Sequence, residues 1–307
     1  MHSTTTTLPS SLLITGVSGH LARLAAEHLF AHTPPPAHLI GTTRTPERAQ
    51  ALAQAGMEVR HADLGQPDGL ATAFQGAQRM LLVSTGSDHA GPVRVAHHRH
   101  AIEAAMAARV QRIVYTSLQQ RPGGALDALV ADHRATEQML AACAIPERVV
   151  LRNAFYAEML LTTLPLALAR GVWHTLRRDA GVAYIPRAEC AVAAAEALAQ
   201  SDVQDPDTLD ITGPEALSPL DVVDIVHQEF GVRIRVEEVS DEDYRMQLEA
   251  TGMPAPMAGV MVYLERGMAS GAMGTVAGGF EQLTRRAPQG VREFLREHRA
   301  VLQASTR

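Results

Sequence analysis

The stretch Leu12–Ala22 (LLITGVSGHLA), close to the start of the chain, constrains the fold more than any other. An apolar run leads into a turn with two glycines, and apolar residues at helical spacing follow. Gly16 allows a tight turn, Gly19 lets the backbone approach a bound group, and Ala22 lets the helix pack closely on the strand. Because the first N–H groups of such a helix attract anions, this strand, turn and helix predict a site that fits a pyrophosphate.

Strand-like and helix-like patterns alternate after this turn. Short runs that predict strands are His38–Thr42, Met57–Arg60, Arg79–Val83, Gln111–Thr116, Arg148–Arg152 and Thr208–Thr212. Between them, helical patterns cover Pro46–Gln54, Pro92–Arg109, Leu126–Ala142 and Arg187–Gln200. This alternation predicts an α/β fold, a doubly wound parallel sheet of the Rossmann type, whose first turn binds a dinucleotide.

The length of 307 residues leaves room for a second, smaller unit. We expect residues 8–152 plus 182–212 to form the nucleotide-binding domain and residues 153–181 plus 213–307 a smaller α/β substrate domain. In the latter, patterns predict an apolar helix over Met159–Arg170, a short strand at Trp173 and a strand over Arg233–Val239. Its methionines either adapt to flat ligands or fill the core; they are Met246, Met253, Met257, Met261, Met268 and Met273.

Composition excludes several functions. The formal charge of -6, from 27 basic and 33 acidic residues, argues against direct binding of nucleic acid. No apolar run reaches the roughly 18 residues that a membrane span needs. Cys143 and Cys190 form no pattern for disulfides or zinc and suit a reducing compartment, and Met1–Thr7 lacks the features of a signal peptide. We therefore expect a cytoplasmic location.

The chain contains no lysine. This excludes a Schiff-base lysine and the Tyr-x-x-x-Lys pair that many dehydrogenases carry on the helix after the fifth strand. In this chain, His133 and Glu137 lie one helical turn apart at that place. The usual proton donor of ketone reduction is thus missing, which argues against an ordinary ketone reductase or epimerase.

Two residues at strand ends bear on the choice of nucleotide. After the second strand, an acidic residue would bind the ribose 2′-hydroxyl of NAD(H), whereas this chain has Arg44, which can pair with the 2′-phosphate of NADP(H). We prefer NADP(H), with NAD(H) still open and a solvated arginine as the alternative. Asp63, after the third strand, either accepts a hydrogen bond from the adenine amino group or caps a helix that begins near Pro67.

Other polar residues follow later strands, where a parallel sheet binds its ligands. Ser84-Thr85-Gly86-Ser87 forms a loop of small residues that lets the middle of the cofactor pass, and Ser117 ends the fifth strand. Asn153 and Tyr156 follow the sixth strand near the expected reactive ring, with helix capping and core packing as alternatives. Of His97, His98 and His100, only His97 and His100 share a face of their helix, so we expect no metal site.

Taken together, these segments resemble the NmrA-like group of atypical short-chain dehydrogenases, which includes type-2 NAD(P)H:quinone oxidoreductases and triphenylmethane-dye reductases. The stretches that carry the resemblance are ITGVSGHLA, TRTPERA, ADL, RMLLVSTG, RIVYTSL, HRATEQML, VVLRNAFYAEM, AYIPRAECA and ITGPEALSPLDVV. Glu189 in PRAECA departs from the aspartate that the family leads us to expect, with an effect on local packing only.

The resemblance implies which residues contact the cofactor. Those predicted to bind NADP(H) are Gly16, Ser18, Gly19, His20, Leu21, Arg44, Asp63, Leu64, Ser84, Thr85, Gly86 and Thr116. It also implies that Asn153 and Tyr156 lie beside the nicotinamide.

We therefore expect an NADPH-dependent reductase of quinones or other flat conjugated acceptors. Hydride addition to a quinone leaves a delocalised anion, so the missing acid matters little. Asn153, Tyr156 and Ser117 would orient the acceptor, and His133 is a weaker candidate donor. The alternative is a non-catalytic redox sensor that binds NADP(H), because the family includes such regulators. A homodimer stays open.

Overall fold

The computed structural model describes residues 11–31, 38–86, 89–119, 126–200 and 208–304. Met1–Thr7 and Ser87, both discussed above, lie outside these ranges. The chain forms a seven-stranded parallel sheet in the order β3-β2-β1-β4-β5-β6-β8, which confirms the doubly wound α/β fold. The strands are β1 (Leu12–Thr15), β2 (Leu39–Thr43), β3 (Glu58–His61), β4 (Arg79–Leu82), β5 (Arg112–Leu118), β6 (Glu147–Asn153) and β8 (Thr208–Ile211).

The central strand β1 explains why the sheet forms here. Its four residues are all buried, and it pairs in register with β2, Leu12 opposite Leu39, and with β4, Leu12 opposite Arg79. A parallel strand covered on both faces is expected to be apolar throughout. By contrast, β3 at the edge carries partly exposed charged residues, which discourage pairing with another chain.

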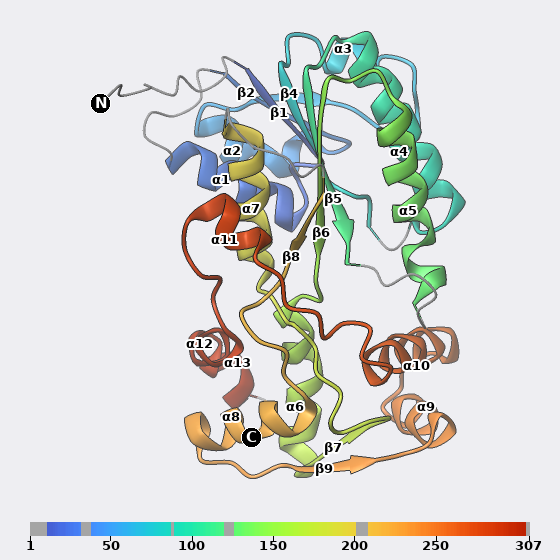
Figure 1. Cartoon of the computed structure of the whole chain (residues 1–307), viewed down its shortest axis with the longest axis vertical. Helices are drawn as coiled ribbons and strands as arrows, with labels where there is room; N and C mark the ends of the chain where they lie inside the picture. Colours follow the sequence, from blue (N-terminus) through green and yellow to red (C-terminus); the bar gives the residue numbers. More distant parts are fainter. Residues whose placement is uncertain (1–10, 32–37, 87–88, 120–125, 201–207, 305–307) are drawn as a thin grey trace.

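Helices cover both faces of the sheet (Figure 1). One face packs under α1 (His20–Ala31), α2 (Gln50–Gln54), α7 (Arg187–Ala199) and α11 (Gly279–Thr284). The other packs under α3 (Leu70–Ala73), α4 (Pro92–Ala107) and α5 (Asp127–Ala142). The expected helix over Pro46–Gln54 is divided into a 3-10 turn, η1 (Pro46–Ala49), and α2. The alanine-rich sequence of α7 lets α1 and the sheet approach it closely, since small side chains leave little between the backbones.

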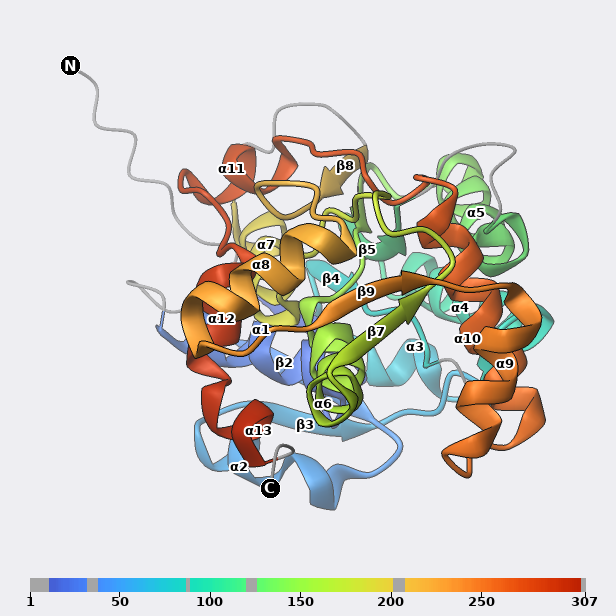
Figure 2. The ribbon, with the colours of Figure 1, turned by 90° about the horizontal axis from the view of Figure 1, so that it is seen from below.

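A smaller unit follows the carboxyl ends of β6 and β8, below the sheet in Figure 1. It contains a separate parallel pair, β7 (Val172–Thr175) and β9 (Arg235–Glu238), with Trp173 opposite Val236. Figure 2 shows this pair side by side between two groups of helices. The helical segments are η3 (Ala157–Met159), α6 (Leu160–Arg170), α8 (Pro219–Phe230), α9 (Asp241–Ala250), α10 (Ala255–Ala269), α12 (Val291–Glu297) and α13 (Arg299–Ala304).

Local signals set the ends of α8 in this unit. Ser218 accepts a hydrogen bond from the Asp221 N–H, and the Asp221 carboxylate accepts one from the Ser218 N–H, which forms a capping box. Gly231 ends the helix with a φ of 74°, a value that glycine adopts without strain. Nearby, the Trp173 side chain is only 6% exposed in the core of the unit.

One segment departs from the expected division of the chain. Helix α11 belongs to the stretch assigned to the smaller domain, yet Phe280 and Leu283 pack in the core that α7 and β8 share. Glu189 in the first turn of α7 forms a two-pronged ion pair with Arg286, with distances of 3.0 and 2.6 Å. The glutamate therefore does more than pack locally, because it ties α7 to the chain that follows α11. None of the helices in the described ranges is long and apolar enough to cross a bilayer.

Candidate active site

The glycine turn after β1 forms one wall of a cavity. Gly16 has a φ of 67°, in the left-handed region that favours glycine, and its carbonyl accepts a hydrogen bond of 2.8 Å from the Gly19 N–H. A Cβ atom on Gly19 would lie 3.1 Å from that carbonyl oxygen, which is tighter than ordinary contact. Helix α1 begins at the next residue, His20, so its free N–H groups end at the cavity.

The cavity has a volume of about 460 Å³ and lies at the carboxyl ends of the first five strands of the sheet. The structure brings together there all twelve residues for which cofactor contact was expected: Gly16, Ser18, Gly19, His20, Leu21, Arg44, Asp63, Leu64, Ser84, Thr85, Gly86 and Thr116. Residues that were not predicted to contact the cofactor also line it, among them Thr15, Thr42, Thr43, His89, His97 and Arg187.

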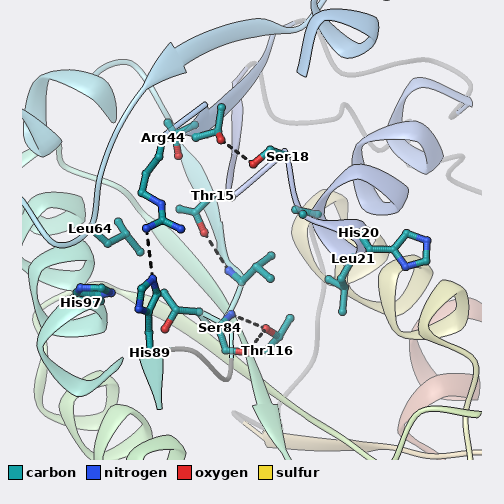
Figure 3. A pocket seen from close by; sticks show the side chains of 18 of the residues that line it. Thr15, Ser18, His20, Leu21, Arg44, Leu64, Ser84, His89, His97 and Thr116 are labelled. Carbon is teal, nitrogen blue, oxygen red and sulfur yellow. Dashed lines mark hydrogen bonds between the residues drawn. The ribbon is translucent and has the colours of Figure 1, made fainter. Parts of the chain in front are cut away.

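The end of β2 is fixed to the glycine turn. The Ser18 and Thr43 hydroxyls lie 2.8 Å apart, and Arg44 extends from the same strand end into the cavity rim. Figure 3 shows Arg44 and His89 on one side of the cavity and His20 on the other. The Arg44 Nη1 lies 3.3 Å from the His89 Nε2, so a fixed positive charge borders the cavity where the sequence predicted it.

Asp63 does not cap a helix. Its Oδ1 accepts a hydrogen bond of 2.9 Å from the Gly65 N–H, and the next helix, α3, begins only at Leu70 with Gly69 as its N-cap. The capping alternative is therefore wrong, because a turn separates Asp63 from that helix. Contact with an adenine amino group stays a prediction, and the place of Asp63 in the cavity lining is consistent with it.

The loop after β4 is held by partners that sequence reasoning missed. The Ser84 N–H donates to the Thr116 hydroxyl over 2.9 Å, and the Thr85 N–H donates to the His98 Nε2 over 3.2 Å. Arg94 donates to the carbonyl oxygens of Thr85 and Gly86, each over 3.1 Å. These side chains come from α4 and β5, and no local sequence pattern links them to the loop.

Burial keeps His98 neutral. Desolvation by burial, helped by the nearby Arg94 charge, lowers the pKa of His98 to about 3. Because its Nε2 accepts from Thr85, its Nδ1 carries the proton and donates to the Thr136 hydroxyl over 2.9 Å. The three neighbouring histidines of α4 thus serve separate places, since His97 lines the cavity and His100 bonds to the Leu64 carbonyl.

His133 lies outside the cavity lining. The Arg94 Nη1 donates to its Nε2 over 3.3 Å and to the Asp132 carboxylate over 2.7 Å. Its Nδ1 must then hold the proton, which points to the Tyr115 hydroxyl 2.8 Å away. Burial and the Arg94 charge lower the pKa of His133. Both ring nitrogens are therefore engaged in a network between α4, α5 and β5.

Ser117 also lies outside the cavity lining. Its hydroxyl donates to the Glu137 carboxylate over 2.6 Å, and Arg152 binds the same carboxylate over 3.0 and 2.6 Å. Hydrogen bonding to Glu137 raises the pKa of Arg152, so the ion pair persists across neutral pH. The serine that was expected to orient a substrate is thus engaged within the sheet layer.

Tyr156 is the candidate catalytic residue that lines the cavity. Burial raises the pKa of its hydroxyl, and the Arg187 guanidinium lies 4.8 Å from the centre of its ring. Arg187 also donates to the His20 Nδ1 over 2.9 Å, which connects the tyrosine to the start of α1, directly after the glycine turn. Asn153 is 2% exposed, does not line the cavity, and both polar atoms of its amide lack a partner among the described residues. A buried amide without a well-formed hydrogen bond is unusual and calls for an explanation, and this one lies close enough to the Tyr156 hydroxyl to lower its pKa.

The described residues fit a dinucleotide. A helix N-terminus reached through two glycines suits the paired phosphates, and the arginine after β2 suits a phosphate on the ribose. No group of three or more His, Cys, Asp or Glu side chains in the described ranges could hold a metal ion.

A second, mainly apolar cavity of about 440 Å³ lies between α6, β7, α9 and α10, and only Met253 and Met261 of the six methionines named above line it. Met273 instead packs in the core of the smaller unit. The methionines therefore divide between the two predicted roles, lining a cavity and filling the core.

Comparison with known proteins agrees with this geometry. Residues 16–150 match the model of the NAD(P)H-binding family. Quinone oxidoreductase 2 of Escherichia coli is 32% identical over 262 residues, which cover 85% of this chain and 89% of that protein. An NmrA-like family domain-containing oxidoreductase of Aspergillus flavus is 28% identical, with 94% of this chain and 95% of that protein covered.

Solved structures give the same result. The Escherichia coli NADPH-dependent quinone oxidoreductase in complex with NADPH superimposes with a TM-score of 0.83 at 29% identity, over 94% of this chain and 99% of that one. The Citrobacter triphenylmethane reductase in complex with NADP(H) gives a TM-score of 0.86 at 26% identity, over 93% and 99%. The chain therefore belongs to the NmrA-like family of NAD(P)H-dependent reductases that includes quinone oxidoreductase 2.

Proposed function

We propose that this protein binds NADPH and transfers a hydride from it to a quinone or a similarly conjugated small molecule. One observation supports NADPH over NADH most strongly. Arg44 borders the same cavity as the phosphate turn, and Asp63, which follows β3 rather than β2, is the one carboxylate among the described residues that line it. A carboxylate at the end of β2 would favour a free ribose hydroxyl, whereas a guanidinium there favours a phosphate.

The chain's own residues divide the work of binding. The turn from Gly16 to Gly19 would hold the pyrophosphate at the start of α1, and Arg44 the 2′-phosphate. Ser84, fixed by Thr116, would support the middle of the nucleotide. The bound cofactor supplies the hydride, and the protein supplies orientation, so that its reactive ring faces the acceptor near Tyr156.

The available groups favour an acceptor that needs little acid catalysis. The Tyr156 hydroxyl carries its proton at neutral pH, as tyrosine ordinarily does, and burial raises its pKa further, so it can donate a hydrogen bond to a developing oxyanion. Asn153 is proposed as the second orienting group, with its unpartnered amide as support. Ser117 and His133 stay predictions for direct roles, and their bonds to Glu137 and Tyr115 favour a positioning role instead.

Steady oxidation of NADPH with a panel of quinones and cationic dyes tests this function. We expect multiple turnover with at least one acceptor. Arg44→Ala should weaken the binding of NADPH much more than that of NADH, measured by calorimetry, because only NADPH carries the 2′-phosphate. The matched control is Arg48→Ala, an exposed arginine of η1 that does not line the cavity. Equal losses for both nucleotides would remove the reason for preferring NADPH, and no acceleration with any acceptor would remove the proposed activity.

A redox sensor is the second candidate function. It is favoured by the engagement of Ser117 and His133 away from the cavity, which leaves few groups for acid catalysis. A sensor would distinguish NADP+ from NADPH in affinity without turnover, and the same measurements separate the two functions.

A further inference from the structure

Two histidines accompany Arg44 at the rim of the cavity. His89, just before α4, has its Nε2 3.3 Å from the Arg44 Nη1, and its ring centre lies 5.0 Å from that of His97 at an angle of 72°. All three residues line the cavity, and Figure 3 shows them together on the side away from the phosphate turn. Two imidazoles, each able to take up a proton, therefore stand beside the arginine to which we assign the 2′-phosphate.

The contact with Arg44 defines the protonation of His89. A guanidinium can only donate hydrogen bonds, so the His89 Nε2 accepts and carries no proton in this arrangement. Partial burial lowers the pKa of the neighbouring His97, which favours its neutral form as well. In this arrangement Arg44 supplies the positive charge of the rim.

The other charged groups around the pair are few. Asp63 after β3 faces His97 and favours its protonation, while His100 on α4 and Arg44 oppose it. Asp88, which precedes His89 in the sequence, lies outside the described residues. Asp63 is thus the one carboxylate among these described neighbours, and a bound dianion would add negative charge beside both imidazoles.

We propose that a 2′-phosphate bound at Arg44 draws a proton from solvent onto the His89–His97 pair, so that NADPH binds with proton uptake and NADH does not. This inference rests on the proposed preference for NADPH. An anion within a few ångströms favours the charged form of an imidazole, and a protonated His89 donates from Nε2 to the phosphate instead of accepting from Arg44. The affinity for NADPH relative to NADH then increases as the pH falls.

Calorimetric titration of the intact protein tests this coupling. NADPH and NADH are each titrated at pH 7.5 in HEPES and in Tris, which bring no phosphate that could compete for Arg44 and whose different ionisation enthalpies reveal the number of protons exchanged. At this pH the 2′-phosphate is already largely a dianion, because the second pKa of a phosphate monoester is about 6. We expect uptake of a fraction of a proton with NADPH and none with NADH. Between pH 8 and pH 7 the NADPH to NADH affinity ratio should increase by up to about tenfold, the limit for one linked proton.

Variants assign the effect to the histidines. His89→Gln with His97→Gln should abolish the proton uptake and flatten the pH dependence, while NADPH still binds through Arg44. His89→Arg supplies a permanent charge, so it should bind NADPH tightly without proton uptake at this position. His174→Gln, on β7 and outside the cavity lining, is the control and should behave as wild type. Equal proton uptake with both nucleotides, or uptake that survives the double substitution, would overturn the inference while the proposed function stands. Failure to bind NADPH at all would overturn both.

Discussion

Replacement of Asp132 by alanine should be among the most damaging single changes in this fold. The carboxylate accepts hydrogen bonds from the Arg94 Nη1 over 2.7 Å and the Gly91 N–H over 2.9 Å, and its other oxygen accepts from the His133 N–H over 2.8 Å. The Arg94 and Asp132 side chains are only 7% and 4% exposed. Removing one member of such a buried pair leaves an uncompensated charge, which typically costs about 3–5 kcal/mol of unfolding free energy.

The same helix offers a matched control. Asp127 pairs with Arg134 over 2.8 Å, but these side chains are 47% and 38% exposed, so Asp127→Ala should cost less than about 1 kcal/mol. Urea unfolding followed by far-ultraviolet circular dichroism measures both losses. Equal losses for the two variants would refute the claim that burial makes the Asp132 pair matter.

A double variant separates stability from function. Arg94→Met with Asp132→Leu replaces the ion pair by apolar groups and should recover most of the lost stability. It cannot restore the bonds from Arg94 to the Thr85 and Gly86 carbonyls, so NADPH affinity should stay reduced. If calorimetry shows wild-type affinity in this stable variant, Arg94 does not position the loop.

Three further predictions concern single residues. The unfolded chain protonates His98 below its ordinary pKa of 6.5, whereas the native state does so only near pH 3. The native state therefore loses stability as the pH falls through this interval, by about 1.4 kcal/mol per pH unit. His98→Gln should reduce the difference in unfolding free energy between pH 7 and pH 5, measured by urea unfolding. Gly16→Ala forces a φ of 67° on alanine, so it should cost about 1–2 kcal/mol and weaken NADPH binding in calorimetry. Ser218→Ala removes the cap of α8 and should cost about 1 kcal/mol in urea unfolding without changing nucleotide affinity, and a change in affinity would contradict the separation of the two units.

The sequence was sufficient wherever the signal is local. The strands begin and end within two residues of their expected bounds, because most are short apolar runs between turns; β3 and β9, with charged residues, are the exceptions in composition. The glycine turn and Arg44 were located correctly at the cavity because strand ends in a parallel sheet meet at one edge. Position along the chain therefore gave most of the residues that line this cavity.

The sequence was insufficient wherever the partner is distant. Nothing in the sequence near His133 indicates that Arg94, 39 residues earlier, donates a hydrogen bond to its Nε2. The same holds for Ser117 and Glu137, which come from different elements, and for Phe280, which returns to pack beside α7. A residue at a strand end can face the cavity or the neighbouring helix, and only the three-dimensional packing decides between them.

The position of Trp173 allows the unfolding of the two units to be followed separately by fluorescence. It is the single indole of the chain, and it lies in β7 of the smaller unit, away from the nucleotide turn. Tryptophan fluorescence therefore reports on the smaller unit alone, whereas a bound dihydronicotinamide would emit at longer wavelength from the unit that contains the seven-stranded sheet. Recording both fluorescence signals during denaturation would show whether the two units unfold in one transition or in two successive ones.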